Sequence, residues 1–571
     1  MTESKRNGPW VKKKKSPGVA LVLLLNFAST TSSCTEQERS SLLRFLSELS
    51  RDGGLTMSWQ DGTDCCQWEG ITCSRDRTVT DVSLASRSIQ GQISPSLGSL
   101  TGLMRLNLSH NLLSGALPQE LMSSSSIIVI DISFNRLNGD LNELPSSTPA
   151  RPLQVLNISS NLFTGQFPLS IWGVMKNLVA LNASNNSFTG HIPSNFCTNS
   201  PTFAVLELSH NQFSGSIPTG LGSCSMLRVL KAGHNNLSGT LPDELFNATS
   251  LEHLSFADNN LQGTLEGENV VKLSKLATLD LGDNNFSCEI PHSIGQLKRL
   301  KELHLNNNKM YGSVPSTLAN CTSLITVVLK SNNFSGDLTN VNFSNLPRLK
   351  TLDLMLNNFS GKIPESIYSC SSLTALRLSS NKFHGELSKG LGNMKSLSFL
   401  SLTDNSFTNI ANALQILRSS NNLTTLLMGH NFLNERMPDD DSINGFENLQ
   451  SICNLTDLLL LDLSSNNLTG TIPASLNNLK FISQFNISYN DLEGPVPDGG
   501  QISTFPSASF DGNLRLCGPM LARNCGSAET PIVSTKQTND KAVSPLAFMI
   551  SFGAFFGLGV LYDQIVLSRF F

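Results

Sequence analysis

Leucines recur along most of this chain in one spacing, followed each time by an asparagine and usually by a glycine and a proline. The alternation in L-x-x-L-x-L predicts a short strand with its leucines inward and the intervening residues in solvent. One copy cannot bury its leucines alone, so we expect the copies to stack on one another. Clear copies are LMRLNLSHNLLSGALP from Leu103, LRVLKAGHNNLSGTLP from Leu227, LKTLDLMLNNFSGKIP from Leu349 and LLLLDLSSNNLTGTIP from Leu458.

The asparagine after each strand turns the chain, and Arg87 takes its place in a degenerate first copy. We expect the side-chain amide to bond backbone groups that no strand pairing reaches. The steps between asparagines are 24 to 26 residues, apart from 35 residues between Asn431 and Asn466. About seventeen units, at about 4.8 Å per strand, would make an inner arc of about 80 Å. The asparagines are Asn111, Asn135, Asn161, Asn186, Asn211, Asn235, Asn259, Asn284, Asn308, Asn332, Asn357, Asn381, Asn405, Asn431, Asn466 and Asn490.

The repeat predicts an α/β solenoid of the leucine-rich-repeat kind, with a concave parallel sheet, over residues 79–497. A solenoid needs capped ends. We expect an N-terminal cap at 34–78, around DCCQWEGITC, and a C-terminal cap at 498–527, around SFDGNLRLCGPMLARNC.

The N-terminus carries a targeting pattern. Four lysines, Lys12 to Lys15, precede a short apolar run from Val19 to Leu25 and then small residues through Ser33. This order is typical of a secretory signal peptide, which we assign to residues 1–33. A nuclear-localisation signal is the alternative interpretation of the lysines, but the apolar run that follows favours secretion.

A second apolar run, from Leu546 to Tyr562, lies near the C-terminus. It would be about 25 Å long as a helix, and its neighbours extend it enough to cross a bilayer. We therefore expect a single-pass type I protein of the plasma membrane with an extracellular ectodomain. The expected segments are a juxtamembrane linker at 528–544, a transmembrane helix at 545–562 and a cytoplasmic tail at 563–571.

Within that run Gly553 and Gly557 form a G-x-x-x-G pair. Small residues at this spacing let a partner helix approach closely, so we expect them at a helix contact. Glycine is common in membrane helices, and the pair therefore has an ordinary explanation as well.

Composition and motifs argue against several functions. Charged residues make up 15% of the chain and the net charge is −4. The chain therefore lacks the excess of basic residues that is typical of nucleic-acid-binding proteins. The sequence contains no H-E-x-x-H motif, phosphate-binding loop, nucleophile elbow or zinc-ligand spacing. We expect neither an enzyme nor a metal site nor a cofactor.

Three signatures together resemble plant leucine-rich-repeat receptors: S-G-x-I-P in the repeats, W-x-G-x-x-C around Trp68 and G-N-x-x-L-C-G in the end cap. The resemblance covers nearly all of residues 34–571. Within the group, the chain is most similar to ectodomains of phytosulfokine and tyrosine-sulfated-peptide receptor kinases and to their kinase-less relatives, the receptor-like proteins. It implies a cell-surface binder of a small secreted peptide that signals through a separate membrane kinase.

Cysteines cluster in both caps, where disulfides form in a secreted chain. The resemblance implies the first two of the expected pairs. The expected disulfides are Cys34–Cys65, Cys66–Cys73 and Cys517–Cys525.

Other cysteines fall inside the repeats. Cys224, Cys321 and Cys370 stand just before strand leucines, and we expect buried thiols there. A disulfide between Cys197 and Cys224, across adjacent units, is the alternative.

Two features depart from the receptor kinases. Kinase motifs are missing from the sequence, and the late repeats lack an island domain where GFENLQSICNLTDLLLLDLSSN begins at Gly445. Leu449 is expected to start a strand, whereas Ile452 to Leu458 reads like the end of another repeat. We favour a deletion that fused two half-repeats; a tolerated irregular unit is the alternative.

Glycosylation sequons help to show which surface stays open, because a bulky glycan keeps its surroundings solvated. Asn107, Asn157, Asn182 and Asn486 lie between strand leucines, so glycans there would crowd both ends of the arc and leave units 6 to 14 open. The expected glycosylation sites are Asn107, Asn157, Asn182, Asn185, Asn236, Asn247, Asn285, Asn320, Asn333, Asn342, Asn358, Asn422, Asn454, Asn467 and Asn486.

Repeat proteins bind partners on the surface between strand leucines. In the open middle, basic residues alternate with acidic ones, which ordinary solvated charge explains. The functional hypothesis is that the basic groups recognise an acidic or sulfated peptide. The expected ligand-binding residues are Arg228, Lys231, His253, Lys301, His304, Lys330, Lys350 and Arg377.

The sequence thus predicts a non-enzymatic receptor-like protein that binds an extracellular peptide or a pathogen-derived ligand. Its expected partners are that peptide, a membrane receptor kinase and the lipid bilayer, with no nucleic acid. An inhibitor of secreted cell-wall hydrolases and a decoy or non-functional remnant are the alternatives.

Overall fold

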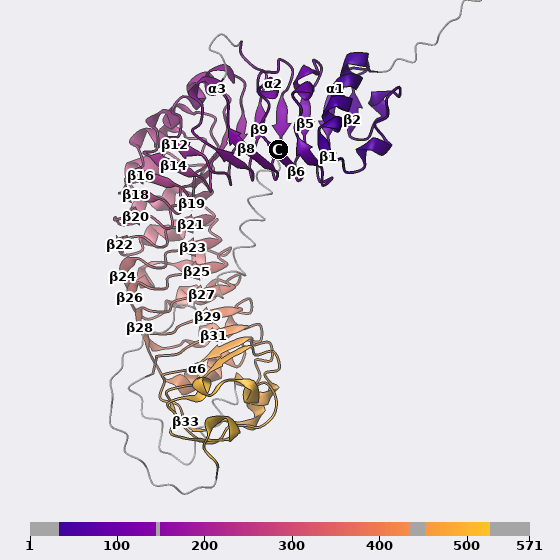
Figure 1. Cartoon of the computed structure of the whole chain (residues 1–571). Helices are drawn as coiled ribbons and strands as arrows, with labels where there is room; N and C mark the ends of the chain where they lie inside the picture. Colours follow the sequence, from indigo (N-terminus) through magenta and orange to yellow (C-terminus); the bar gives the residue numbers. More distant parts are fainter. Residues whose placement is uncertain (1–33, 144–148, 433–451, 526–571) are drawn as a thin grey trace, which may run out of the picture.

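The computed structural model describes residues 34–143, 149–432 and 452–525, which form a curved solenoid (Figure 1). The expected signal peptide, Leu449, the expected membrane span and tail, and Gly553 and Gly557 lie outside these residues. Among the described helices, none has the length and apolar character to cross a membrane.

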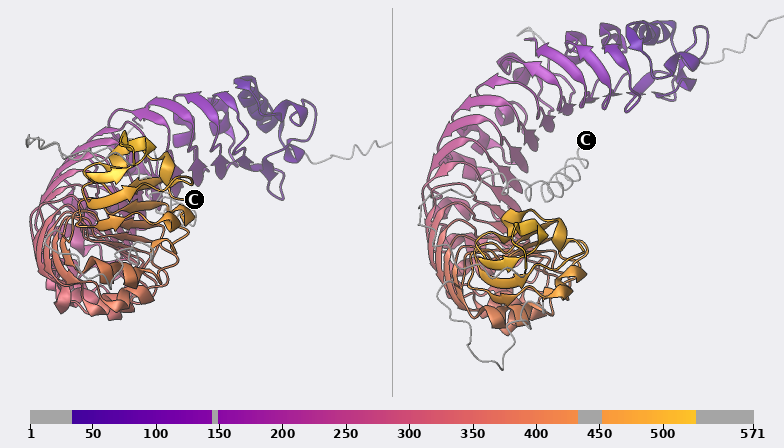
Figure 2. Two further views of the ribbon diagram at one scale, coloured as in Figure 1. Left: turned by 90° about the horizontal axis from the view of Figure 1, so that it is seen from below. Right: turned by 60° about the horizontal axis from the view of Figure 1, so that its bottom comes forward.

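The inner side of the arc is a parallel sheet, as the leucine spacing predicts, and the leucine-rich-repeat solenoid is confirmed. The described residues contribute seventeen parallel strands, which pair one after another in chain order, and Figure 2 shows them following the curve of the arc. The central residue of each three-residue strand, and Val82 in β3, points into the core and is buried. The strands are β3 (Val79–Ser83), β5 (Arg105–Asn107), β7 (Val129–Asp131), β9 (Val155–Asn157), β11 (Ala180–Asn182), β13 (Val205–Glu207), β15 (Val229–Lys231), β17 (His253–Ser255), β19 (Thr278–Asp280), β21 (Glu302–His304), β23 (Thr326–Val328), β25 (Thr351–Asp353), β27 (Ala375–Arg377), β29 (Phe399–Ser401), β31 (Thr425–Leu427), β32 (Leu460–Asp462) and β34 (Gln484–Asn486).

A second set of short strands follows the asparagine turns and pairs along the other side of the arc (Figure 1). Its glycines sit at positive φ, for example Gly385 at 86°, a conformation that a side chain would strain. These strands are β4 (Gln90–Gln92), β6 (Leu112–Gly115), β8 (Arg136–Asp140), β10 (Leu162–Thr164), β12 (Thr189–Gly190), β14 (Gln212–Gly215), β16 (Asn236–Gly239), β18 (Asn260–Gly263), β20 (Asn285–Phe286), β22 (Tyr311–Gly312), β24 (Asn333–Asp337), β26 (Asn358–Gly361), β28 (Lys382–Glu386), β30 (Ser406–Thr408), β33 (Thr469–Thr471), β35 (Asp491–Pro495) and β36 (Arg515–Cys517).

Helical turns complete each unit, and most are single 3₁₀ turns such as η5 (Asp243–Asn247) and η7 (Ser316–Asn320). The proline of the repeat sits just before many of them, where its fixed φ suits the turn. The α-helices are α1 (Glu36–Ser47), α2 (Gln119–Met122), α3 (Leu169–Val174), α4 (Phe196–Asn199), α5 (Gly267–Val270) and α6 (Ile410–Leu417).

The repeated asparagines form a buried to half-buried ladder whose side-chain amides bond the backbone, as expected. Asn405 shows the pattern: its Nδ2 lies 3.1 Å from the Leu378 carbonyl, 2.9 Å from that of Leu402 and 3.3 Å from that of Thr403. Its Oδ1 accepts the N–H of Phe383 at 2.9 Å. Each amide therefore joins its own turn to the preceding unit.

The 35-residue step does not interrupt the concave sheet. Strand β31 pairs directly with β32, with Leu426 opposite Leu461. The Asn431 N–H donates to Asn466 Oδ1 at 2.9 Å; among the described ladder steps, only the Arg87 N–H makes the same bond, to Asn111. The step therefore adds one concave strand in the described residues, and the ladder continues across it.

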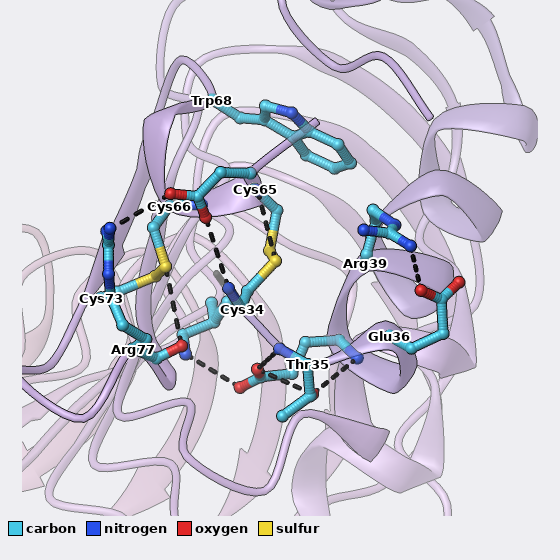
Figure 3. Close-up of a disulfide and its surroundings, with 12 residues drawn as sticks. Cys34, Thr35, Glu36, Arg39, Cys65, Cys66, Trp68, Cys73 and Arg77 are labelled. Atoms are coloured by element: carbon cyan, nitrogen blue, oxygen red, sulfur yellow. Dashed lines mark hydrogen bonds and ion pairs between the residues drawn. A yellow bond between two sulfur atoms is a disulfide. The ribbon is translucent and has the colours of Figure 1, made fainter. Parts of the chain in front are cut away.

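The N-terminal cap is held by two disulfides, Cys34–Cys65 and Cys66–Cys73, the pairs that the resemblance implied (Figure 3). Thr35 caps α1 in a capping box, which satisfies backbone groups at the helix start. Strand β2 (Ile71–Cys73) pairs antiparallel with β3 and closes that end of the sheet.

One expectation about the cysteines is wrong. Cys224 is bonded to Cys197, with Cα atoms 5.0 Å apart, and is not a free thiol. The two residues meet because helix α4 and the turn before Cys224 lie in adjacent units. Cys321 and Cys370 are buried free thiols, as expected.

The C-terminal cap, with its Cys517–Cys525 disulfide, continues the ladder beyond the last concave strand. Asn513 donates to the carbonyls of Ile487 and Phe510, and its Oδ1 accepts the Leu492 N–H at 3.1 Å. The cap is thus a partial repeat, a feature that was not predicted from the sequence.

Candidate functional site: the charged concave face

The predicted ligand-binding residues all lie on or beside the concave strands. Lys231, His253, His304 and Arg377 are strand residues, whereas Arg228, Lys301 and Lys350 immediately precede strands and Lys330 follows β23. Strand pairing sets the neighbours, so that Lys231 lies between Glu207 and Ser255. The eight side chains thus spread over strands β15 to β27.

Arg228 is engaged by an acidic neighbour one unit away. Its Nε and Nη2 each lie 3.0 Å from a different oxygen of Glu252. This bidentate geometry is the strong form of a charge-assisted hydrogen bond. The arginine side chain is 44% exposed, so the pair sits at the surface of the concave face.

A polar chain crosses three neighbouring strands beside this pair. His253 Nδ1 lies 3.1 Å from Thr278 Oγ1, and that hydroxyl donates to Glu302 Oε2 at 3.0 Å. Because the hydroxyl is donated to the carboxylate, His253 Nδ1–H can donate to the hydroxyl oxygen. The chain gives His253 a fixed orientation.

Arg377 lies in a more enclosed setting. Its Nη1 is 3.4 Å from Asp353 Oδ2, and its guanidinium carbon lies 4.4 Å from the centre of the Phe399 ring. The carboxylate side chain is only 4% exposed. Burial raises the pKa of Asp353, while Arg377 and Lys330 oppose that shift.

Lys330 belongs to the same charge cluster. Burial lowers its pKa, and the carboxylates of Asp353 and Asp283 act in the opposite direction. Arg377 and Lys330 thus favour the charged form of Asp353, and Asp353 favours the charged form of Lys330, while burial acts against both charges.

Lys301 and Lys350 differ from the arginines, and His304 is a residue of the β21 strand beside Lys301. In the part of the chain that the structure describes, no ion pair joins Lys301 or Lys350 to an acidic side chain. Both lysines precede their strands, and Ile325 occupies the same position on the strand between them. Two ammonium groups thus flank one apolar side chain.

Histidines also line the edge of the sheet, at the position before four of the ladder asparagines. His234 Nδ1 lies 2.7 Å from Asp258, and His430 Nδ1 lies 2.8 Å from Asp404. His210 stacks on His234 with ring centres 4.0 Å apart. Burial, with the neighbouring His234, lowers the pKa of His210. Residues at this position adopt positive φ.

The sequence showed that acidic residues alternate with the basic ones of the face, but the pairing of these charges was not predicted. The signal was present, because Arg228 and Glu252, like Asp353 and Arg377, are 24 residues apart, one repeat length. Opposite charges at that spacing meet on adjacent strands. The contact with Phe399 had no comparable signal.

Nowhere among residues 34–143, 149–432 and 452–525 do three histidine, cysteine, aspartate or glutamate side chains gather as a possible metal site. The groups that the concave face does present are charged side chains and hydrogen-bond donors and acceptors.

Comparisons with known proteins agree with this architecture. The leucine-rich-repeat N-terminal domain family matches residues 35–74. Leucine-rich-repeat families match residues 322–383 and several segments between 102 and 479. All of these matches fall inside the solenoid and its first cap.

Sequence relatives come from Arabidopsis thaliana. Receptor-like protein 3 is 40% identical over 108 residues, which cover 19% of this chain and 14% of that protein. Phytosulfokine receptor 1 is 36% identical over 118 residues, which cover 20% of this chain and 12% of that protein. The chain thus matches only a small part of the length of these relatives.

Solved structures extend the similarity. The ectodomain of the Arabidopsis thaliana receptor kinase GASSHO1/SCHENGEN3, in complex with CASPARIAN STRIP INTEGRITY FACTOR 2, matches with a TM-score of 0.63 and 28% identity over 76% of this chain and 56% of that one. The ectodomain of the Arabidopsis receptor kinase HAESA, in complex with an extended IDA peptide hormone ligand, matches with a TM-score of 0.57 and 26% identity over 84% of this chain and 98% of that one.

Proposed function

Because the chain carries a leucine-rich-repeat ectodomain of the plant receptor type, we propose that it binds an extracellular peptide on its concave face, at strands β15 to β27. The two matched ectodomain structures are complexes, and the HAESA ligand is a peptide hormone. The supporting observation in this chain is that charged side chains lie on or beside every concave strand from β15 to β27.

Within that face, we place the contact with an anionic peptide group at Lys301 and Lys350. Arg228 and Arg377 already bind Glu252 and Asp353, and a ligand would have to break those pairs. The two lysines are not committed to an ion pair with a described residue, so their ammonium groups can bind a carboxylate or a sulfate. Ile325 between them would contact an apolar side chain of the same peptide.

Signalling would require a partner. We propose a single-pass plasma-membrane protein whose apolar segment at 545–562 contacts a receptor kinase through Gly553 and Gly557. The support is the spacing of the glycines and the similarity to plant cell-surface receptors. Loss of kinase co-precipitation after Gly553→Leu with Gly557→Leu is the expected result, and full retention would remove the glycine contact.

Peptide binding is tested by calorimetric titration of the full chain in detergent with a short tyrosine-sulfated peptide and with its unsulfated twin. We expect sulfate-dependent binding, weakened at least tenfold by Lys301→Ser with Lys350→Ser, which corresponds to about 1.4 kcal/mol.

Lys309→Ser is the matched control, because this exposed lysine follows a ladder asparagine and lies outside the concave strands. It should leave the affinity unchanged. Equal affinity of the double variant and the parent would remove the lysines from the site. A folded chain that binds neither peptide would instead favour a decoy or an unrelated ligand.

A further inference from the structure

The glycosylation sequons of the described residues fall into two structural groups. Four of them place the asparagine at the last residue of a concave strand, namely Asn107, Asn157, Asn182 and Asn486. The others lie outside the concave strands, either in the turn before a strand or in the segment after it. We call the first group strand sequons and the second edge sequons.

In the strand sequons, the serine of the sequon is the hydrogen-bond partner of its own asparagine. Asn157 Oδ1 accepts from the Ser159 N–H at 3.2 Å and from its hydroxyl at 2.8 Å. Asn182 accepts the same two bonds from Ser184 at 3.1 and 2.7 Å. The pair is a side-chain turn that ends the strand.

Aspartate makes the same turn at the equivalent position of other units. Asp131 Oδ1 accepts from the Ser133 N–H at 3.0 Å and from its hydroxyl at 2.7 Å, and Asp462 accepts the Ser464 N–H at 2.9 Å. An aspartate cannot carry an N-glycan. The turn needs an acceptor side chain at the end of the strand and a serine donor two residues later. This structural requirement explains the N-x-S pattern at these positions without glycosylation.

The strand position leaves little room for a modification at two of these sequons, whereas Asn107 and Asn486 are half-buried. Asn157 and Asn182 are only 7% and 6% exposed. Strand pairing places them side by side, with Asp131 and Glu207 as the next residues in the row. A glycan on Nδ2 is bulky and hydrated, and a folded protein that carried one here would have to pull the amide out of this row.

Edge sequons have the opposite environment. Asn247 and Asn320 are exposed and are the last residues of η5 and η7. Asn236 and Asn333 are exposed and are the first residues of β16 and β24. Both kinds of position lie beside the concave sheet, where an attached sugar extends into solvent.

We propose that the N-glycans of this protein are confined to edge sequons and that the four strand sequons remain unmodified turns. The concave sheet is then free of sugar along its whole described length, including strands β5 to β13. This revises the expectation that glycans crowd both ends of the arc. It also extends the surface open to a macromolecular ligand beyond the charged segment. The proposal does not depend on peptide binding. Glycan mapping can contradict it without affecting the proposed peptide site, and the reverse also holds.

The direct test is site mapping on the full chain expressed in plant cells. Enzymatic deglycosylation in ¹⁸O-water converts each glycosylated asparagine to a labelled aspartate, which peptide mass spectrometry identifies. We expect the label at Asn247, Asn320 and Asn333 and unlabelled asparagine at Asn157 and Asn182.

Asn342 is an internal control for the turn itself. It accepts the same two bonds from Ser344, at 3.3 and 2.6 Å, but it is exposed and lies outside the concave strands. We expect Asn342 to be labelled, because a place in the row of concave strands excludes the glycan, whereas the hydrogen bonds of the turn do not. Labelling of Asn157 or Asn182 to the level of Asn342 would overturn the proposal.

A second measurement uses variants that remove a sequon and keep its asparagine. Ser159→Ala with Ser184→Ala leaves both backbone N–H groups in the turns, and we expect no change in electrophoretic mobility. Thr322→Ala removes the Asn320 sequon at an exposed position and should shift the band by one glycan. A glycan-sized shift in the serine double variant would overturn the proposal even if mapping coverage were incomplete.

Discussion

The asparagine ladder and the concave face come from the same repeats but differ in how far their residues vary. In the ladder, one residue type makes the same bonds in nearly every described unit, as Asn381 and Asn405 do. On the concave face, the equivalent residue changes from Lys231 to Ser255 to Asp280 on three neighbouring strands. Both regions are continuous across the whole arc.

The difference follows from solvent. Ladder amides satisfy backbone groups that water does not reach, and leaving such a group unpaired costs about 1–3 kcal/mol. Concave side chains face a surface where a lost contact can be replaced by water. The buried region therefore determines the fold, and the concave face is free to determine what is bound.

The largest effect is expected at the ladder. Asn405→Ala leaves the Phe383 N–H without its acceptor and removes the donor to three carbonyls. We expect the free energy of unfolding to fall by about 4 kcal/mol, measured by urea titration. Asn260→Ala is the control, since this exposed asparagine adjoins a ladder residue, and it should change little. Similar losses in both variants would contradict a special role for the ladder.

The Cys197–Cys224 disulfide should come next. It closes a sequence separation of 27 residues between two adjacent units. Cys197→Ser with Cys224→Ser should lower the free energy of unfolding by about 3 kcal/mol, through the gain in freedom of the unfolded chain. The experiment is the same titration without reductant, because reductant would also break the disulfides of the two caps. An unchanged free energy of unfolding in the double variant would contradict the assignment.

A smaller and pH-dependent effect is expected on the concave face. Burial holds the pKa of Asp353 above its usual value, and Arg377 opposes that shift. The folded state therefore keeps this proton to higher pH than the unfolded chain, and the associated stability is lost as the pH rises above the usual aspartate range. Arg377→Leu raises the pKa further, and it should cost about 2 kcal/mol at pH 7 and clearly less at pH 4.

Arg228→Leu is the matched control for that pair. Its partner Glu252 is partly solvated and the arginine is 44% exposed, so we expect a loss of about 0.5 kcal/mol that salt reduces. Equal losses for Arg228→Leu and Arg377→Leu, with no difference between pH 4 and pH 7, would show that burial of Asp353 does not matter.

Much of the architecture could be predicted because it repeats. The leucine spacing and the ladder asparagines follow from local periodicity, since each unit meets the same neighbours. Even the acid–base pairs of the concave face were within reach of the sequence, because Arg228 and Glu252 stand one repeat apart. These pairs were hard to recognise in the sequence because many other charged residues have no opposite charge one repeat away.

What the sequence determined by itself was therefore the solenoid: its strands, its turns and the surface on which charges gather. Only the tertiary structure decided which cysteine Cys224 meets, that Asn513 extends the ladder into the C-terminal cap, and that Asn157 and Asn182 end as buried turns. The physical reason is that burial and contact between units depend on how neighbouring copies stack, and a sequon or a lone cysteine looks the same in sequence whether its side chain points into solvent or into the next unit.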